Sequence, residues 1–203
     1  MRLFVGIDIP PDIRQRITDF VDRVRTDAPD ARWVKPETYH ITLKFIGEYK
    51  PERLDELKTA LSTVAAPTID IAFRGCGFFS PRSPKAFWIG VQAGDTLPSL
   101  AAAVQEACSK IGIPAEDRAF TPHLTLARTG SGRPQGSPRD RNKPVMWNLR
   151  ETVQRMFPQP DFGTMTAQEF FLYESKTLPH GAQYSKIGRF PLGSAGVSPA
   201  KTI

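Results

Sequence analysis

The pattern His-x-Thr-Leu occurs twice in this chain, at residues 40–43 (HITL) and again at residues 123–126 (HLTL). Each copy sits in an apolar run of the kind that forms a β-strand. Successive side chains on a strand point to opposite faces, so the His and the Thr of each copy share one face and the two apolar residues share the other. Each motif can therefore present a polar pair to a cleft while it anchors a core.

Chance does not explain the repeat, because two matching copies in a chain with three histidines would arise about once in ten thousand such chains. A histidine that only completes a hydrogen bond in the core is one alternative, and the shared Thr argues against it. A metal site is another. Neither motif has an acidic residue or a Cys within its four residues, which argues against zinc and against harder cations. We therefore expect no metal and no cofactor.

The duplicated motif favours displacement at phosphorus. The entering and leaving oxygens lie roughly in line in such a reaction, and each needs its own proton carrier. An imidazole can hold either protonation state near neutral pH, so His40 and His123 are the candidate catalytic pair. The hydroxyls of Thr42 and Thr125 are short, uncharged donors suited to the other phosphate oxygens.

The charge of the chain favours an anionic partner: 27 Lys and Arg stand against 21 Asp and Glu, which gives a net charge of +6 and a pI near 9.5.

Two cysteines, Cys76 and Cys108, do not make a disulfide framework, so free thiols in a reducing compartment are expected. The start of the chain has the pattern of a strand and not of a signal peptide. No stretch approaches transmembrane length. These observations predict a cytoplasmic, monomeric protein with no membrane contact.

Strand and helix patterns alternate along the chain, and the two halves echo each other in order. We expect strands at 3–9, 32–35, 39–46, 68–79, 85–91, 120–128, 165–174 and 183–191, with helices from 10, at 51–64, at 97–111 and at 145–157. The sequence therefore predicts an α+β fold, with two pseudo-symmetric lobes of antiparallel-rich sheets and outer helices around a central cleft. We expect residues 1–192 to form this single two-lobed domain and 193–203 to form a loose tail.

Longer segments around the motifs carry a resemblance to a known family. Residues 33–48, 121–128, 172–175 and 188–192 resemble the RNA 2′,3′-cyclic phosphodiesterases, also called 2′-5′ RNA ligases, of the two-histidine phosphoesterase superfamily. The resemblance runs from Met1 to about Leu192. It implies a bilobal α+β fold and hydrolysis of an RNA-terminal 2′,3′-cyclic phosphate to a 2′-phosphomonoester without metal.

The resemblance also implies roles for single residues. His40 would be the acid for the 3′ oxygen and His123 the base for water, whereas the residues alone do not distinguish the two histidines. Thr42, Thr125 and Arg128 would bind the phosphate. Strict alternation would aim Arg128, five positions after His123, away from the cleft. Its role requires a bulge, a strand end or the reach of a long side chain.

Three further features stay open at this stage. Lys44 shares parity with His40 and could face the cleft as a substrate contact, or it could be a solvated lysine at the strand end. His180, between Pro179 and Gly181, is expected at the surface. The Gly/Pro/Ser/Arg-rich insertion at about 129–146 is longer than the family pattern. It either guides an RNA backbone or is a solvated loop. Its basic residues are Arg133, Arg139, Arg141 and Lys143.

Other functions compete with RNA-end hydrolysis. A small substrate, such as a cyclic phosphate of a nucleotide or of an ADP-ribose derivative, would use the same pair of histidines. A non-catalytic RNA- or nucleotide-binding module would keep the cleft, although binding alone does not need two proton carriers. The positive charge leans toward RNA with a 2′,3′-cyclic phosphate end as the partner. Ligation, the chemical reverse, is left open.

Metal independence gives a direct test of the motif. The repeat supplies imidazoles and hydroxyls but no carboxylates for a hard cation and no third soft ligand for zinc. Hydrolysis of a 2′,3′-cyclic phosphate should therefore proceed at its full rate after dialysis against EDTA. Loss of activity that one particular divalent ion restores would contradict this prediction.

Overall fold

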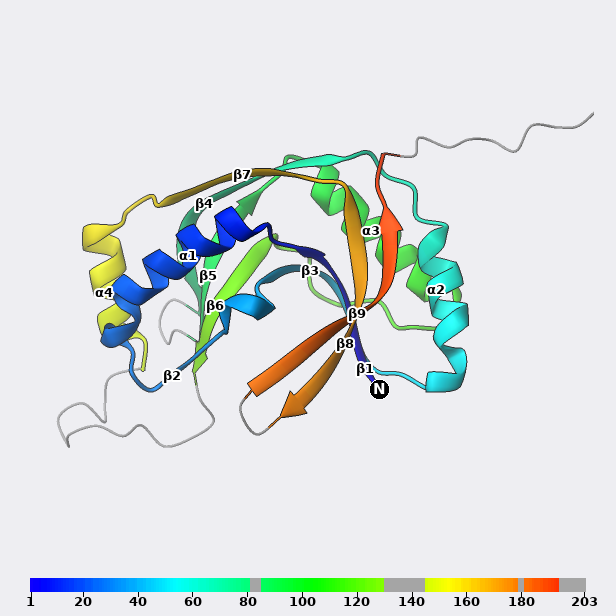
Figure 1. Cartoon of the computed structure of the whole chain (residues 1–203), viewed down its shortest axis with the longest axis horizontal. Helices are drawn as coiled ribbons and strands as arrows, with labels where there is room; N and C mark the ends of the chain where they lie inside the picture. Colours follow the sequence, from blue (N-terminus) through cyan, green and yellow to red (C-terminus); the bar gives the residue numbers. More distant parts are fainter. Residues whose placement is uncertain (81–84, 130–144, 179–180, 194–203) are drawn as a thin grey trace, which may run out of the picture.

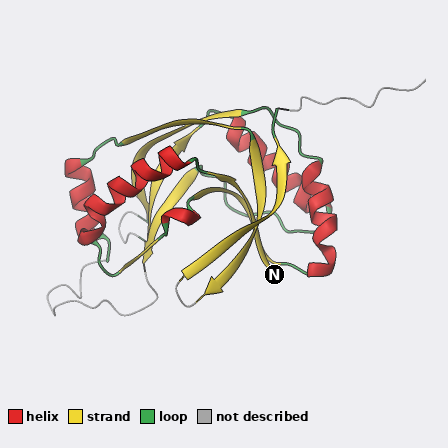
Figure 2. Ribbon diagram, in the orientation of Figure 1, coloured by secondary structure: helices red, strands yellow, loops and turns green. Residues whose placement is uncertain are grey.

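The structure is a computed structural model that describes residues 1–80, 85–129, 145–178 and 181–193. Most of the basic insertion, at 130–144, lies outside these residues, as do His180 and the tail from 194. Two antiparallel sheets form the centre of the molecule, and the helices lie along its outer sides (Figures 1 and 2). The expected α+β class with antiparallel sheets and outer helices is confirmed.

The two sheets divide the strands between them. The first sheet has the order β3-β1-β8-β9, and the second has the order β2-β6-β5-β4-β7. The strands of the first sheet are β3 (His40–Glu48), β1 (Arg2–Asp8), β8 (Glu169–Leu178) and β9 (Gly181–Pro191). Those of the second are β2 (Ala31–Trp33), β6 (His123–Thr129), β5 (Ala86–Gln92), β4 (Ile69–Phe79) and β7 (Asp161–Ala167). The motif strands β3 and β6 contact each other across the boundary between the sheets (Figure 1).

The helices cover the sheets in pairs. Helices α1 (Pro11–Val24) and α4 (Trp147–Met156) pack together on the side of the second sheet, where α1 contacts β7. Helices α2 (Leu54–Ser62) and α3 (Thr96–Lys110) pack together beside β3 and β9. Three short 3₁₀ helices complete the set within the described residues: η1 (Arg25–Asp27), η2 (Pro36–Thr38) and η3 (Pro51–Arg53). In the described parts of the chain, no helix is long and apolar enough to cross a membrane.

Helix α1 shows how the sequence sets these elements. Pro11 occupies the first turn, where its fixed φ suits a helix and its missing N–H costs nothing. Asp12 follows in the same turn and interacts favourably with the positive end of the helix dipole. The apolar residues recur at helical spacing, and all five predicted from that spacing are buried. They are Ile13, Ile17, Phe20, Val21 and Val24.

One expected strand is wrong. Residues 165–174 do not form a continuous strand, because the chain leaves the second sheet at the end of β7 and enters the first as β8. Gln168 stands between the two strands, and its carbonyl accepts a hydrogen bond from the amide of Leu192 at 2.7 Å. The buried residues Ala167 and Phe170 flank this crossing. No Gly or Pro marks the change of sheet between residues 165 and 174, so the sequence offers no turn signal there and indicates one strand.

Both motif strands bulge at the leucine of the motif. In the pairing of β1 with β3, Val5 lies opposite Lys44 and Gly6 opposite Thr42, so Leu43 is the extra residue. The pairing of β5 with β6 repeats this arrangement and leaves Leu126 as the extra residue. A bulge shifts the alternation of side chains by one position. Residues after the leucine therefore exchange faces in both strands.

A glycine keeps β5 close to its neighbour behind the second motif. Gly90 lies directly opposite His123 in the β5–β6 pairing. A Cβ at Gly90 would lie 2.4 Å from the backbone oxygen of Arg74, where β4 bulges toward β5. Because backbone atoms meet there, a side chain can be accommodated only if the strands separate.

We expect Gly90→Ala to lower the free energy of unfolding by about 1–3 kcal/mol, the usual cost of overpacking. Gly188→Ala is the matched control, since its Cβ would meet side-chain atoms of Phe190 and Leu172 at 3.1–3.2 Å, where a shift of a few tenths of an ångström is enough. Urea denaturation of both variants measures the difference. Wild-type stability of the Gly90→Ala variant would show that the close approach at Gly90 is relieved without cost.

Candidate active site

The two motifs line one small pocket between the sheets. Its volume is about 70 Å³, which is enough for a phosphate-sized group and too small for a nucleoside. We call it the phosphate pocket. Its lining residues are Val34, Thr38, His40, Thr42, Phe45, His123, Thr125, Arg128 and Tyr184. Five of the residues singled out from the sequence thus come together here: both histidines, both motif threonines and Arg128.

Each imidazole is held by a backbone carbonyl two residues before it. Nδ1 of His40 lies 2.7 Å from the oxygen of Thr38, and Nδ1 of His123 lies 2.7 Å from the oxygen of Thr121. A carbonyl oxygen only accepts hydrogen bonds, so Nδ1 carries the proton in both rings. Nε2 is then the nitrogen that gains or loses a proton in each ring.

The two Nε2 atoms have different surroundings. Nε2 of His40 lies 3.0 Å from Oγ1 of Thr42, whose hydroxyl donates to it when the ring is neutral. In the second motif, Arg128 donates to Oγ1 of Thr125 at 3.4 Å. The Thr125 hydroxyl proton stays available for a bound anion. The two motif threonines therefore have different partners: Thr42 is hydrogen-bonded to His40, and Thr125 is hydrogen-bonded to Arg128.

Aromatic rings fix the orientation of both imidazoles. Phe4 lies 4.6 Å from the His40 ring, and Tyr184 meets that ring edge-on at 5.3 Å. Phe79 meets the His123 ring edge-on at 4.9 Å. These rings also displace water from the imidazoles, which weakens the solvation of a charged ring.

Burial lowers the pKa of both histidines from 6.5. At His40 the carbonyl of Thr38 and the carboxylate of Asp8 oppose burial by raising the pKa, whereas Arg128 and His123 lower it further. At His123 the carbonyl of Thr121 raises the pKa and Arg128 lowers it. Both imidazoles are therefore mostly neutral at pH 7 in the unliganded protein. A bound anion would offset Arg128 and stabilise the protonated rings.

The bulges decide which residues after the motifs reach the pocket. Arg128 lines the phosphate pocket because the bulge at Leu126 turns it to the same face as His123. The bulge was one of the three conditions that its predicted role required. Phe45 occupies the equivalent position five residues after His40, and it is 53 % exposed.

The expectation that Lys44 could face the cleft is wrong. Lys44 is 1 % exposed, and its ammonium donates to Oε1 of Gln105 at 3.1 Å and to the carbonyl of Pro114 at 2.9 Å. The same bulge that exposes Phe45 turns Lys44 inward. A solvated lysine at the strand end is therefore also wrong, and Lys44 is part of the interior.

Sequence reasoning missed the remaining members of the phosphate pocket. Val34 and Thr38 precede the first motif, and Tyr184 comes from β9 near the other end of the chain. No local pattern ties Tyr184 to His40, since only strand pairing places β9 beside β8, which in turn pairs with β1. Phe45 lies in the segment that carries the family resemblance, but strict alternation of side chains predicts that it points away from the pocket.

The cysteines and acidic residues do not form a metal site in the part of the chain that the structure describes. Within it, no group of three or more His, Cys, Asp or Glu side chains is arranged to hold an ion. Cys76 and Cys108 are unpaired, as expected from their number. Burial raises the pKa of each thiol to about 11, so neither is a ready nucleophile near neutral pH.

Comparisons with known proteins agree with this architecture. The profile of the family described as LigT like Phosphoesterase matches residues 7–88 and again residues 89–184. The RNA 2′,3′-cyclic phosphodiesterase of Archaeoglobus fulgidus is 31 % identical over 191 residues, which cover 94 % of this chain and 99 % of that protein. The chain therefore belongs to the LigT-like phosphoesterases, which are enzymes of the two-histidine phosphoesterase superfamily.

Solved structures show the same fold. The crystal structure of E. coli LigT complexed with 3′-AMP is 25 % identical, with a TM-score of 0.74 over 94 % of this chain and 97 % of that one. The structure of TT0787 from Thermus thermophilus is 24 % identical, with a TM-score of 0.75 over 97 % of this chain and all of that one. At that identity the second similarity concerns the fold alone.

The electrostatics of the pocket can be tested without turnover. We expect NMR titrations to give pKa values below 6.5 for His40 and His123 in the free protein. Inorganic phosphate should raise both by about one unit, because its charge stabilises the imidazolium forms. Chloride at equal ionic strength is the control. Unchanged pKa values at saturating phosphate would show that the anion does not bind between the two rings.

Proposed function

We propose that this protein hydrolyses the 2′,3′-cyclic phosphate at an RNA end to a 2′-phosphomonoester, without a metal ion. The arrangement that carries the proposal is the pair of imidazoles that line one phosphate-sized pocket, each with Nδ1 bound to a backbone carbonyl and Nε2 left for proton transfer. A simple phosphate-binding module would not need two such groups.

The proposed reaction uses each histidine once. Water attacks phosphorus, and Nε2 of His123 takes one of its protons. The bond from phosphorus to the 3′ oxygen breaks, and that oxygen takes a proton from Nε2 of His40. The product keeps its phosphate on the 2′ oxygen. Proton exchange with solvent returns both rings to their starting states, so the cycle consumes only water.

The acid needs a proton that the unliganded site does not hold at pH 7. Burial and Arg128 lower the pKa of His40, so the ring is mostly neutral before substrate binds. An anionic phosphate in the pocket offsets Arg128 and raises that pKa. Binding of the substrate thus favours the protonated form of His40. The imidazolium needed as the acid is then formed mainly in the complex with substrate.

Three side chains would bind the phosphate. The guanidinium of Arg128 and the hydroxyls of Thr42 and Thr125 line the pocket beside the two imidazoles. Charge-assisted hydrogen bonds from a guanidinium are the strongest of these contacts and favour the charge that builds up as water attacks. The exposed ring of Phe45 at the rim offers a stacking surface for a base.

The names of similar proteins support the same substrate class. The relative from Archaeoglobus fulgidus is an RNA 2′,3′-cyclic phosphodiesterase, and the E. coli structure holds 3′-AMP. The excess of basic residues in this chain agrees with an RNA substrate. We also propose that the protein acts as a cytoplasmic monomer on RNA ends, and that the two-lobed domain spans residues 1–192.

The deciding experiment compares two substrates. A short RNA that ends in 2′,3′-cyclic phosphate and adenosine 2′,3′-cyclic phosphate are each incubated with the protein, and the position of the product phosphate is read by ³¹P NMR. We expect 2′-phosphate from both, with the higher kcat/KM for RNA. Failure to open either ring would reject the proposal. Preference for the mononucleotide would point to a small-molecule substrate.

The two histidines should act as one unit. His40→Ala and His123→Ala should each lower kcat by at least about a thousandfold, and the double variant should lose little more, because groups that act together are not additive. Single-turnover assays on the short RNA measure these rates. A single variant that kept more than a small fraction of wild-type turnover would contradict the mechanism.

A further inference from the structure

A second cavity opens beside His40 and shares part of its wall with the phosphate pocket. Its volume is about 300 Å³. It has Thr38, His40 and Tyr184 in common with the phosphate pocket, so the two are continuous around the His40 ring. We call it the side pocket. Its other lining residues are Asp8, Arg14, Glu37, Tyr39, Tyr173 and Lys186.

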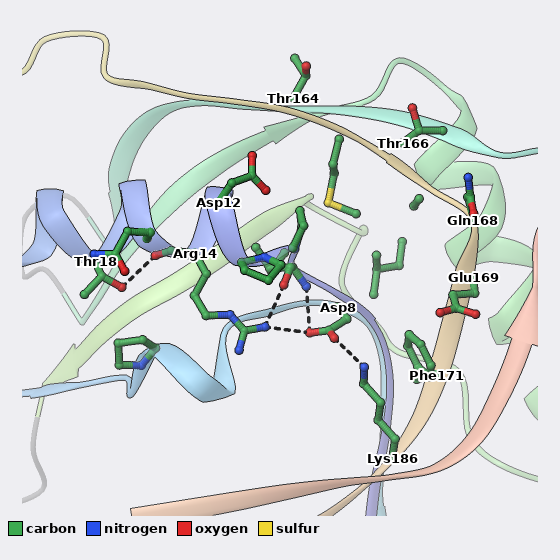
Figure 3. A pocket seen from close by; sticks show the side chains of 18 residues that line it. Asp8, Asp12, Arg14, Thr18, Thr164, Thr166, Gln168, Glu169, Phe171 and Lys186 are labelled. Carbon is green, nitrogen blue, oxygen red and sulfur yellow. Dashed lines mark hydrogen bonds and ion pairs between the residues drawn. The ribbon is translucent and has the colours of Figure 1, made fainter.

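The wall of the side pocket holds a cluster of two cations and one carboxylate, Asp8, which lies opposite His40 in the pairing of β1 with β3. Oδ1 of Asp8 accepts hydrogen bonds from the amide of Ile9 at 2.9 Å and from Arg14 at 3.2 Å. Its Oδ2 accepts from the ammonium of Lys186 at 2.5 Å. Figure 3 shows Arg14 reaching Asp8 from α1 and Lys186 reaching it from β9. The three side chains of the cluster carry a net charge of +1, and both oxygens of the Asp8 carboxylate already accept hydrogen bonds. The carboxylate of Glu37 also lines the side pocket.

The same wall offers donors that have no acceptor within the described residues. The hydroxyl of Tyr173 and Nε of Arg14 are buried, and neither finds a hydrogen-bond partner there. Tyr173 as a whole is only 5 % exposed. Buried polar groups without a partner are rare and costly, and they are often completed by a ligand. Donors without acceptors beside two cations match the oxygens of a phosphate.

The side pocket lies where the RNA chain should continue. The proposed acid His40 protonates the 3′ oxygen, so the ribose of the terminal nucleotide lies on the His40 side of the phosphate pocket. The 5′ carbon of that ribose leads away from the cyclic phosphate. In RNA it bears the next phosphodiester, whereas a cyclic mononucleotide has only a hydroxyl there.

The space beyond the cluster also suits a chain. A larger hollow of about 840 Å³ shares Asp8, Arg14 and Lys186 with the side pocket (Figure 3). The cluster therefore stands between a cavity of nucleoside size and a hollow with room for a further nucleotide. Uncharged polar residues line much of that hollow, and the carboxylates of Asp12 and Glu169 lie in its wall as well. The uncharged polar residues are Gln15, Thr18, Thr164, Thr166 and Gln168.

We propose that Lys186, Arg14 and Tyr173 bind the phosphate attached to the 5′ carbon of the terminal nucleotide, so that the enzyme distinguishes RNA ends from cyclic mononucleotides. This inference rests on the proposed function for the position of the ribose. It assigns the side pocket to the second phosphate of the substrate and leaves the reacting phosphate to Arg128 and the motif threonines.

Three substrates test the proposal. They are adenosine 2′,3′-cyclic phosphate, the same compound with a 5′-phosphate, and the dinucleotide ApA with a 2′,3′-cyclic phosphate end. The wild-type protein should show a KM about tenfold lower for the second and third than for the first, the expected effect of a charge-assisted contact. Equal KM values for the three would overturn the proposal.

Variants locate the effect. Lys186→Gln should reduce the tenfold advantage to about twofold or less, when each phosphorylated substrate is compared with the unphosphorylated compound in the same variant. Tyr173→Phe should also reduce the advantage without loss of stability, because its hydroxyl makes no hydrogen bond within the described residues. Lys176→Gln is the matched control: it removes a lysine of the adjoining strand β8 that pairs with Glu174 at 3.4 Å. An equal loss in the Lys176 and Lys186 variants would indicate a general charge effect and overturn the proposal.

A binding measurement separates this inference from the proposed function. Calorimetry compares adenosine 2′-phosphate with adenosine 2′,5′-bisphosphate and needs no turnover. Tighter binding of the bisphosphate that disappears in Lys186→Gln supports the side pocket even if no cyclic phosphate is opened. Hydrolysis without any advantage of the bisphosphate would reject the side pocket and leave the proposed function standing.

Discussion

The bulge at the leucine of each motif strand decides what the site contains. Without it, strict alternation would place Lys44 and Ala127 on the face of the histidines. With it, Phe45 and Arg128 take that face and the two preceding residues enter the interior. The same irregularity occurs at the same position of both repeats, so it belongs to the motif strand itself. The strands β3 and β6 belong to different sheets, yet each thus presents the first, third and sixth residue counted from its histidine to the same pocket.

The repeat is symmetric in backbone and asymmetric in side chains, and the asymmetry gives the two halves of the site different roles. Five residues after the histidine, one strand supplies an aromatic ring and the other a guanidinium. Across from the histidine, β1 supplies Asp8 and β5 supplies Gly90. A carboxylate therefore acts on His40 alone, while Arg128 lowers the pKa of both rings. Two chemically identical groups become distinct through these neighbours, as an acid and a base must.

The fold and the site were predictable where local patterns are strong. Helix α1 has a proline in its first turn and five apolar residues at helical spacing, and alternation alone placed the four motif residues on one face. The change of sheet at Gln168 was not predictable, because no Gly or Pro occurs there. The contribution of Tyr184 was not predictable either, because it depends on the pairing of distant strands. Arg128 required the family resemblance as well. The error at Lys44 arose because neither motif leucine signals a bulge, so the shift is visible only in the strand pairing.

The buried Lys44 links the two motif strands although it does not reach the pocket. Its ammonium binds Gln105 of α3 and the carbonyl of Pro114, in the segment that leads to His123. Glu116 of that segment accepts a hydrogen bond from the amide of Phe45 at 2.9 Å. The strand that bears the first histidine is thus tied to the chain that enters the second motif. A buried ammonium without hydrogen bonds is strongly destabilising, so these acceptors must stay in place. Because a proposed acid and base must hold their positions to within about 0.5 Å for in-line displacement, this interior contact would affect the chemistry through the relative position of the two histidines.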